Sequence, residues 1–154
     1  MHVDVFSTPG PLDLSLRSYS SLQKLTLVIQ SEGPTLADMH AQWALLAQFV
    51  TQVPCGVQQI TIVVDCSHDV PRAINRRVSC FDWDLVGWGL SQCGGLRWVM
   101  VELRGRLCLP KWSEGSAEQV RRALGALGTR VTVELTESSA YVEGRTPQMS
   151  RRLW

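Results

Sequence analysis

The residues best suited to chemistry stand together in one short stretch, DCSHD, at positions 65 to 69. This stretch offers a nucleophile, a base and carboxylates in Asp65, Cys66, Ser67, His68 and Asp69. It directly follows an apolar segment that is typical of a strand, and ligand-binding groups of α/β proteins gather beyond the carboxyl ends of parallel strands. The stretch is therefore the place where a small α/β enzyme would have its active site.

Two arguments favour a polar loop over an active site at these positions. Neighbours on one loop rarely aim at a common point, since catalytic triads are assembled from distant segments. The sequence also has no G-x-S-x-G nucleophile elbow. We therefore expect no catalytic residues and no enzymatic activity, and keep a small α/β enzyme that uses the loop 65–69 as the alternative.

The cysteines indicate neither a metal site nor a disulfide framework. They are five in number, widely spread and without a C-x-x-C pair, at positions 55, 66, 80, 93 and 108. This odd and scattered set favours reduced, mostly buried thiols. Cys66, His68 and Cys80 would need a fourth ligand to hold zinc, and their spacing matches no zinc pattern. We expect no metal and no cofactor.

Composition and charge exclude several classes of partner. The 154 residues suit one domain, and 15 basic against 14 acidic residues leave a net charge of +1. The chain therefore has no large excess of positive charge that would attract nucleic acid or an anionic membrane surface. The amino terminus lacks a secretory pattern, and no stretch approaches the length of a membrane helix. We expect an intracellular protein, cytoplasmic or nuclear, that binds neither nucleic acid nor membrane.

A repeated template predicts the strands that would position these residues. LQKLTLVIQ at 22–30 recurs as VQQITIVVD at 57–65 and LRWVMVELR at 96–104, with a weaker fourth copy, RVTVEL, at 130–135. In the fourth copy, Val131, Val133 and Leu135 fill the last three apolar positions of the template. Each copy alternates, so one side is wholly apolar while eight of the twelve residues on the other side are polar or charged. This contrast predicts a sheet that is packed on one face and partly open on the other.

Helical patterns fill the intervals between the copies. Apolar residues recur at three- and four-residue spacing in 37–53, 79–93 and 116–128. Ser79 or Asp82 would cap the second helix, and Ser116 with Gln119 would form a capping box on the third. Gly87 and Gly89 weaken the second helical pattern.

Alternating strands and helices predict parallel strands joined by helical crossovers. We expect an α/β fold, an irregular leucine-rich-repeat-like layer of about four parallel strands with three helices packed on one face. A single domain would span 1–154, with an irregular segment at 1–20 that includes a partial extra strand, HVDVF, and a flexible tail at 138–154.

Candidate contact residues follow from the partly open face. Trp43, Trp83 and Trp88 fit the helix stripes and are predicted to be core, whereas Trp98 falls on the open face beside Met100. Aromatic residues and methionine are enriched at the centres of interfaces. The residues predicted to bind a partner are Thr26, Val28, Thr61, Val63, Trp98, Met100, Trp112, Thr132 and Glu134.

The template L-x-x-L-x-L-x-L resembles leucine-rich repeats. More specifically, SSLQKLTLVIQ, FDWDLVGWGLSQCGGLRWVMVELRG and VRRALGALGTRVTVELTES resemble the C-terminal part of F-box-type proteins of basidiomycete fungi, over residues 20–137. The resemblance implies a repeat region that recognises a substrate protein for a ubiquitin ligase. The F-box itself, which docks on a Skp1-type adaptor, has no counterpart here, because no L-P-x-E-I-type segment precedes the repeats.

The function expected from the sequence is therefore that of a non-catalytic protein-recognition scaffold, like the substrate-binding part of an F-box-type protein. Its partner would be a protein, and adaptor binding is not carried over. The alternatives are the small α/β enzyme and a truncated gene product without an independent function.

Overall fold

The computed structural model describes residues 2–4, 21–30, 44, 46–66, 78–105, 110–139 and 151–153. The elements in chain order are β1 (His2–Asp4), β2 (Lys24–Gln30), β3 (Gln59–Asp65), α3 (Trp83–Ser91), β4 (Trp98–Gly105), α4 (Glu114–Gly125), β5 (Thr132–Ser139) and β6 (Arg151–Leu153). Residues 44 and 46–50, between β2 and β3, are also helical.

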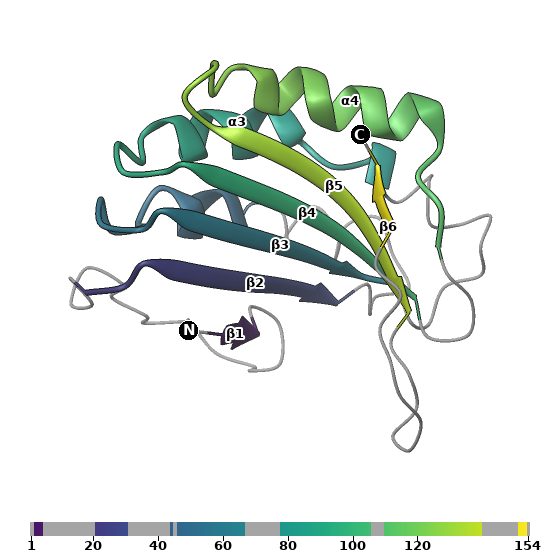
Figure 1. Ribbon diagram of the computed structural model, residues 1–154, viewed down its shortest axis with the longest axis horizontal. Coiled ribbons are helices and arrows are strands. Elements are labelled where there is room, and N and C mark those ends of the chain that lie inside the picture. Colours follow the sequence, from purple (N-terminus) through teal and green to yellow (C-terminus); the bar gives the residue numbers. More distant parts are fainter. Residues whose placement is uncertain are drawn as a thin grey trace.

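The strands form one sheet in which the order along the chain is also the order in space, from β1 to β6 (Figure 1). Strands β1 to β5 are parallel, and β6 runs antiparallel to β5. The four predicted strands are β2, β3, β4 and β5. The predicted α/β fold with a layer of parallel strands is confirmed.

The register confirms that the template copies are equivalent, with one exception. Leu25, Ile60 and Val99, which share the fourth template position, are register partners in β2, β3 and β4. In the fourth copy, Val133 rather than Val131 pairs with Val99, so the predicted alignment was wrong by two residues. A shift of two keeps every side chain on its predicted face, because side chains alternate with period two.

All described helices pack on one face of the sheet. The inward residues of 46–50, α3 and α4 belong to the same buried cluster as the apolar face of the strands. Leu46, Val86 and Val120 are fully buried there, opposite strand residues such as Ile62 and Val101. The three predicted helical intervals are thus occupied, although the part of 37–53 outside 44 and 46–53 lies beyond the described residues.

Helix α3 begins at Trp83 because Asp82, one of the two predicted caps, accepts a hydrogen bond from the Leu85 amide at 3.0 Å. Trp83 is buried and its indole donates to the Val78 carbonyl at 3.0 Å. Trp88 was predicted to be core, and this was wrong, because 57% of it is exposed. A helix of this length buries one stripe, and Trp83, Val86 and Leu90 fill it.

Helix α4 begins earlier than predicted. Ser113, not Ser116, is its amino-terminal cap and accepts from the Ser116 amide at 3.2 Å. Ser116 is itself buried, 1% exposed, inside the first turn. The predicted apolar stripe of the helix, with Val120 and Leu124 at its centre, faces the core as expected.

The two glycines of α3 allow close packing between helices. A Cβ on Gly87 would lie 2.5 Å from the Ala123 carbonyl oxygen of α4, and one on Gly89 would lie 3.0 Å from Val50 Cγ1. The helical pattern therefore contains glycines because α3 packs closely against both its neighbours.

Short strands lie in both terminal segments. β1 falls within the predicted extra strand HVDVF. β6 falls in the segment that was predicted to be a flexible tail, and its residues pair with Leu135 to Glu137 of β5. β5 itself continues to Ser139, into the segment assigned to the tail.

Candidate functional site

The face of the sheet opposite the helices, here called the second face, carries its side chains in rows set by the parallel register. The first row is Lys24, Gln59, Trp98 and Thr132, the second is Thr26, Thr61, Met100 and Glu134, the third is Val28, Val63, Glu102 and Thr136, and the fourth includes Asp65, Arg104 and Ser138. The sheet therefore gathers on one surface residues that are far apart in the chain.

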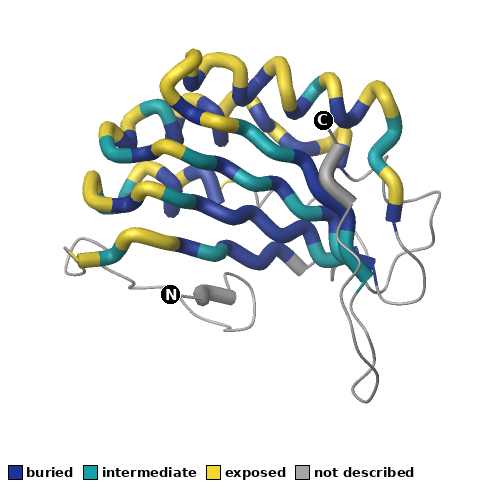
Figure 2. Tube along the Cα trace, viewed as in Figure 1, coloured by how far each residue is buried: buried dark blue, intermediate teal, exposed yellow. Residues whose placement is uncertain are grey.

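Burial of the second face increases from the first row to the third, and the described residues of the fourth row are half-buried again (Figure 2). Lys24 and Thr132, at the outer ends of the first row, are exposed, and the other residues of the first two rows are half-buried except Thr61, which is 8% exposed. In the third row, Val63 is 0% exposed and Val28 is 4% exposed. We call the eight residues of the first two rows the open surface.

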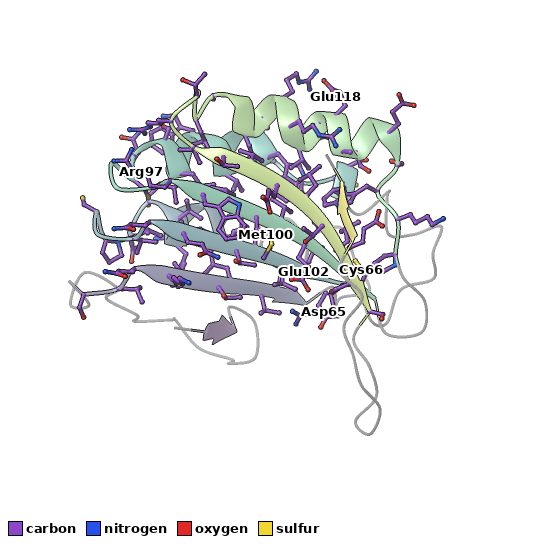
Figure 3. The ribbon with its side chains drawn as sticks, viewed as in Figure 1. Asp65, Cys66, Arg97, Met100, Glu102 and Glu118 are labelled. Carbon is purple, nitrogen blue, oxygen red and sulfur yellow. The ribbon has the colours of Figure 1, made fainter. Side chains whose placement is uncertain are left out.

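Trp98 and Met100 occupy the middle of the open surface, on the central strand β4 (Figure 3 labels Met100). Both are half-buried, and each is flanked in its row by polar residues of β3 and β5. The Trp98 indole nitrogen is shielded from solvent and has no hydrogen-bond acceptor among the described residues. An apolar centre surrounded by polar groups is the usual composition of a protein-binding site.

Three predicted contact residues are not part of the open surface. Val28 and Val63 are on the second face, as predicted, but are buried and cannot contact a partner in this conformation. Trp112 packs against the core cluster. Its amide donates to Glu137 Oε1 at 2.8 Å and its indole to the Thr136 carbonyl at 3.1 Å, so it anchors the segment before α4 to β5.

The remaining predicted contact residues, Thr26, Thr61, Trp98, Met100, Thr132 and Glu134, are brought together on the open surface. Lys24 and Gln59 complete it. Thr61 contributes little area because it is buried.

A polar cluster at the carboxyl ends of the strands was missed by the sequence analysis. Glu102 Oε1 accepts from Ser138 Oγ at 2.5 Å and from Arg104 Nε and Nη2 at 3.1 and 3.0 Å. Asp65 is the register partner of Arg104 on the next strand. Figure 3 shows Glu102 and Asp65 toward this end of the sheet. The alternation of residues in β4 predicts that Glu102 and Arg104 lie on the second face. That Ser138 lies beside them follows only from the register between β4 and β5.

The loop 65–69 is described only at its start. Asp65 is half-buried at the end of β3, and Cys66 is buried, with its thiol directed at the Val64 carbonyl, 3.7 Å away. Ser67, His68 and Asp69 lie outside the described residues. Within the described ranges, no three histidine, cysteine, aspartate or glutamate side chains gather in a way that would hold a metal ion.

Comparison with known proteins gives no relative for this fold and surface. No protein-family model matches the chain, and neither curated proteins nor solved structures give a match. The described part of the chain also contains no helix long and apolar enough to cross a membrane.

Proposed function

We propose that this protein is a non-catalytic recognition module that binds another protein through the open surface. The observation that carries the proposal is the pairing of half-buried Trp98 and Met100 at the centre of a sheet face opposite the helices. Tryptophan at the centre of a surface dominates binding energy more often than other residues.

The scaffold supports this proposal because it holds the contact residues rigidly. β4 is hydrogen-bonded on both sides, to β3 and to β5, so Trp98 and Met100 lose little backbone entropy on binding. Polar residues of the neighbouring strands, such as Gln59 and Glu134, would form the rim. A rim of this kind contributes selectivity more than affinity.

The resemblance to F-box-type proteins is part of the proposal. By that analogy, the bound partner is a substrate protein, and the open surface is where it would be recognised. Docking on an adaptor is not proposed.

The test compares Trp98→Ala with Trp88→Ala in affinity capture from cells of the source organism. Trp88 is the matched control, because it is an exposed tryptophan on the helix side of the molecule. Proteins that bind the open surface should be retained by the wild type and by Trp88→Ala and lost by at least tenfold from Trp98→Ala. The thermal midpoint of Trp98→Ala should stay close to that of the wild type.

Two results would contradict the proposal. One is an identical set of captured proteins for all three chains. The other is a large loss of stability in Trp98→Ala, which would place this residue in the core.

A second candidate function is enzymatic, and the polar cluster is the observation that favours it. Ser138 donates to Glu102, and Asp65 lies on the neighbouring strand, all three in the carboxyl-terminal halves of parallel strands. This is the end of the sheet near which α/β enzymes place their active sites. The experiment is hydrolysis of an activated ester, p-nitrophenyl acetate. An enzyme of this kind would turn it over and lose the activity in Ser138→Ala, whereas equal rates for both chains would remove the candidate.

A further inference from the structure

A pocket of about 510 Å³ opens at the end of the molecule where the chain turns from the helices into β3 and β4. It lies away from the polar cluster at the carboxyl ends of the strands. Its walls are Thr51, Gln52, Val53, Pro54, Cys55, Gly56, Gln92 and Cys93. Two cysteines from different repeats therefore share one pocket.

The two cysteines stand in matching turns of consecutive repeats. The Val57 amide donates to the Pro54 carbonyl, and the Leu96 amide donates to the Cys93 carbonyl, both at 3.1 Å. The strands that follow are adjacent in the sheet, and the Trp98 amide donates to the Gln58 carbonyl at 3.0 Å. Because Val57 and Leu96 hold the same place in the template, the two turns stack on one another.

The residues on either side of Cys93 lie in close contact with the segment 50–55. A Cβ on Gly89 would meet Val50, and a Cβ on Gly95 would collide with the carbonyl oxygen of Cys55. Between these glycines, Cys93 Sγ lies 4.0 Å from the Val50 carbonyl oxygen. Residues on both sides of Cys93, Gly89 before it and Gly95 after it, thus lie close to the segment 50–55.

This arrangement suits a disulfide. Bridged cysteines have Cα atoms about 4.4–6.8 Å apart, and here both cysteines line one pocket from stacked turns, Cys55 two residues before Val57 and Cys93 three residues before Leu96. We propose that Cys55 and Cys93 are a dithiol modification site that hydrogen peroxide converts to a reversible disulfide across the pocket.

The difference in exposure sets the order of the reaction. Cys55 is exposed, whereas Cys93 is 2% exposed. The Cys55 thiolate attacks one peroxide oxygen, the O–O bond breaks, and Cys55 becomes a sulfenic acid while hydroxide leaves and takes up a proton. Cys93 then gives up its proton, its sulfur attacks the Cys55 sulfur, and the S–O bond breaks with loss of water. Two thiols lose two protons and two electrons, and the peroxide becomes two waters.

The bridge would connect the segment that follows the helical residues 46–50 to the turn before β4, which carries Trp98. Oxidation would therefore close the pocket and join two repeats that otherwise only pack together. A covalent link of this kind restricts the unfolded chain and raises the thermal midpoint.

The experiment treats the full chain with a small excess of hydrogen peroxide, blocks the remaining thiols and maps the peptides by mass spectrometry. Trypsin alone leaves Cys55 joined to Cys66 and Cys80 joined to Cys93, so a second protease that cleaves before Asp65 and Asp82 separates all four. The expected product is a peptide pair that links Cys55 to Cys93, two hydrogens lighter than the thiols, and dithiothreitol should release it.

Variants separate this site from general cysteine oxidation. Cys93→Ser should trap the Cys55 sulfenic acid, which dimedone labels, and Cys55→Ser should abolish the bridge. Cys80→Ser is the matched control, an exposed thiol outside the pocket walls, and should form the bridge as the wild type does.

The wild-type map is decisive even if a variant fails to fold. Oxidation of Cys55 to sulfinic or sulfonic acid without a Cys55–Cys93 peptide would overturn the proposal. Bridges between other cysteine pairs at equal yield would also overturn it. A rise of the wild-type midpoint by several degrees on oxidation, reversed by dithiothreitol, would support it.

Discussion

Trp98 is half-buried, but its indole nitrogen is shielded from solvent and has no acceptor among the described residues, and this distinguishes it from the buried Trp83. The Trp83 indole donates to Val78, whereas the Trp98 indole nitrogen has no acceptor among the described residues. An unsatisfied buried donor costs about 1–3 kcal/mol. Trp98→Phe removes that donor, so we expect its free energy of unfolding to stay within about 1 kcal/mol of the wild type or to rise.

Trp83→Phe is the control for this prediction. This substitution removes the hydrogen bond to the Val78 carbonyl and leaves part of the core unfilled. The free energy of unfolding should therefore fall by about 1–3 kcal/mol. Urea denaturation of both variants measures the difference. Equal losses for the two variants would show that the Trp98 indole nitrogen makes a stabilising hydrogen bond, contrary to this prediction.

Cys93 makes the stability of the protein depend on pH in the alkaline range. Burial, then the neighbouring Cys55, raises the pKa of Cys93 from 9.0 to about 11, against an opposing effect of Arg130. The folded state therefore favours the neutral thiol. Its contribution, roughly 2–3 kcal/mol, is fully present below pH 9 and is lost as the pH rises from 9 to 11.

The measurement is the midpoint of urea unfolding at pH 8 and at pH 11 under reducing conditions. Other groups titrate in this range, so the wild type is compared with Cys93→Ala. The wild type should lose more stability between the two pH values than the variant. Parallel losses would contradict the raised pKa.

Individual site residues could be predicted only in part. Alternation placed Trp98, Met100 and Glu134 on the correct face, because the direction of a side chain along a strand is a local property. It could not show that Val63 is buried on that same face. Burial depends on what covers the strand, which no local pattern contains.

At the scale of elements, the packing of α3 against α4 rests on Gly87. An alanine Cβ there would lie 2.5 Å from the Ala123 carbonyl oxygen, which is backbone and cannot move aside easily. We expect Gly87→Ala to lower the free energy of unfolding by about 1–3 kcal/mol. Thermal or urea unfolding measures this loss.

Gly115 is the matched control, a helical glycine with nothing within 4 Å of the added Cβ. Gly115→Ala should be neutral or more stable by up to about 1 kcal/mol, because alanine favours the helix. A stabilising effect of Gly87→Ala would show that α3 and α4 can separate without loss.

The elements themselves were largely predictable, and their ends were not. Hydrophobic spacing of three and four residues located α3 and α4, because one buried stripe is enough to define a helix. The cap of α4 was misplaced from Ser113 to Ser116. Both serines fit the capping chemistry, and only the burial of Ser116 distinguishes them.

At the scale of the whole molecule, protection should be greatest at the centre of the sheet. β3 and β4 are paired on both sides over seven or more residues, whereas β6 is a three-residue edge strand. Amide hydrogens that open only with global unfolding exchange most slowly. Hydrogen exchange followed by mass spectrometry should therefore show slowest exchange in 59–65 and 98–105 and fastest exchange in 151–153. Slower exchange in β6 than in β3 would contradict this order of protection.

The sequence by itself determined the four main strands of the layer: which segments form them, that they lie side by side and parallel, and which face of each is apolar. These properties depend on the period of the pattern and on the order of elements along the chain. Only the tertiary structure decided which residues of the second face are exposed, and it showed that Trp88 is not a core residue. Trp88 is exposed and Trp112 packs against the core, because burial is set by contacts between segments distant in the chain. For the same reason, the cluster of Glu102, Arg104 and Ser138 and the pocket shared by Cys55 and Cys93 form only when the repeats are stacked in register.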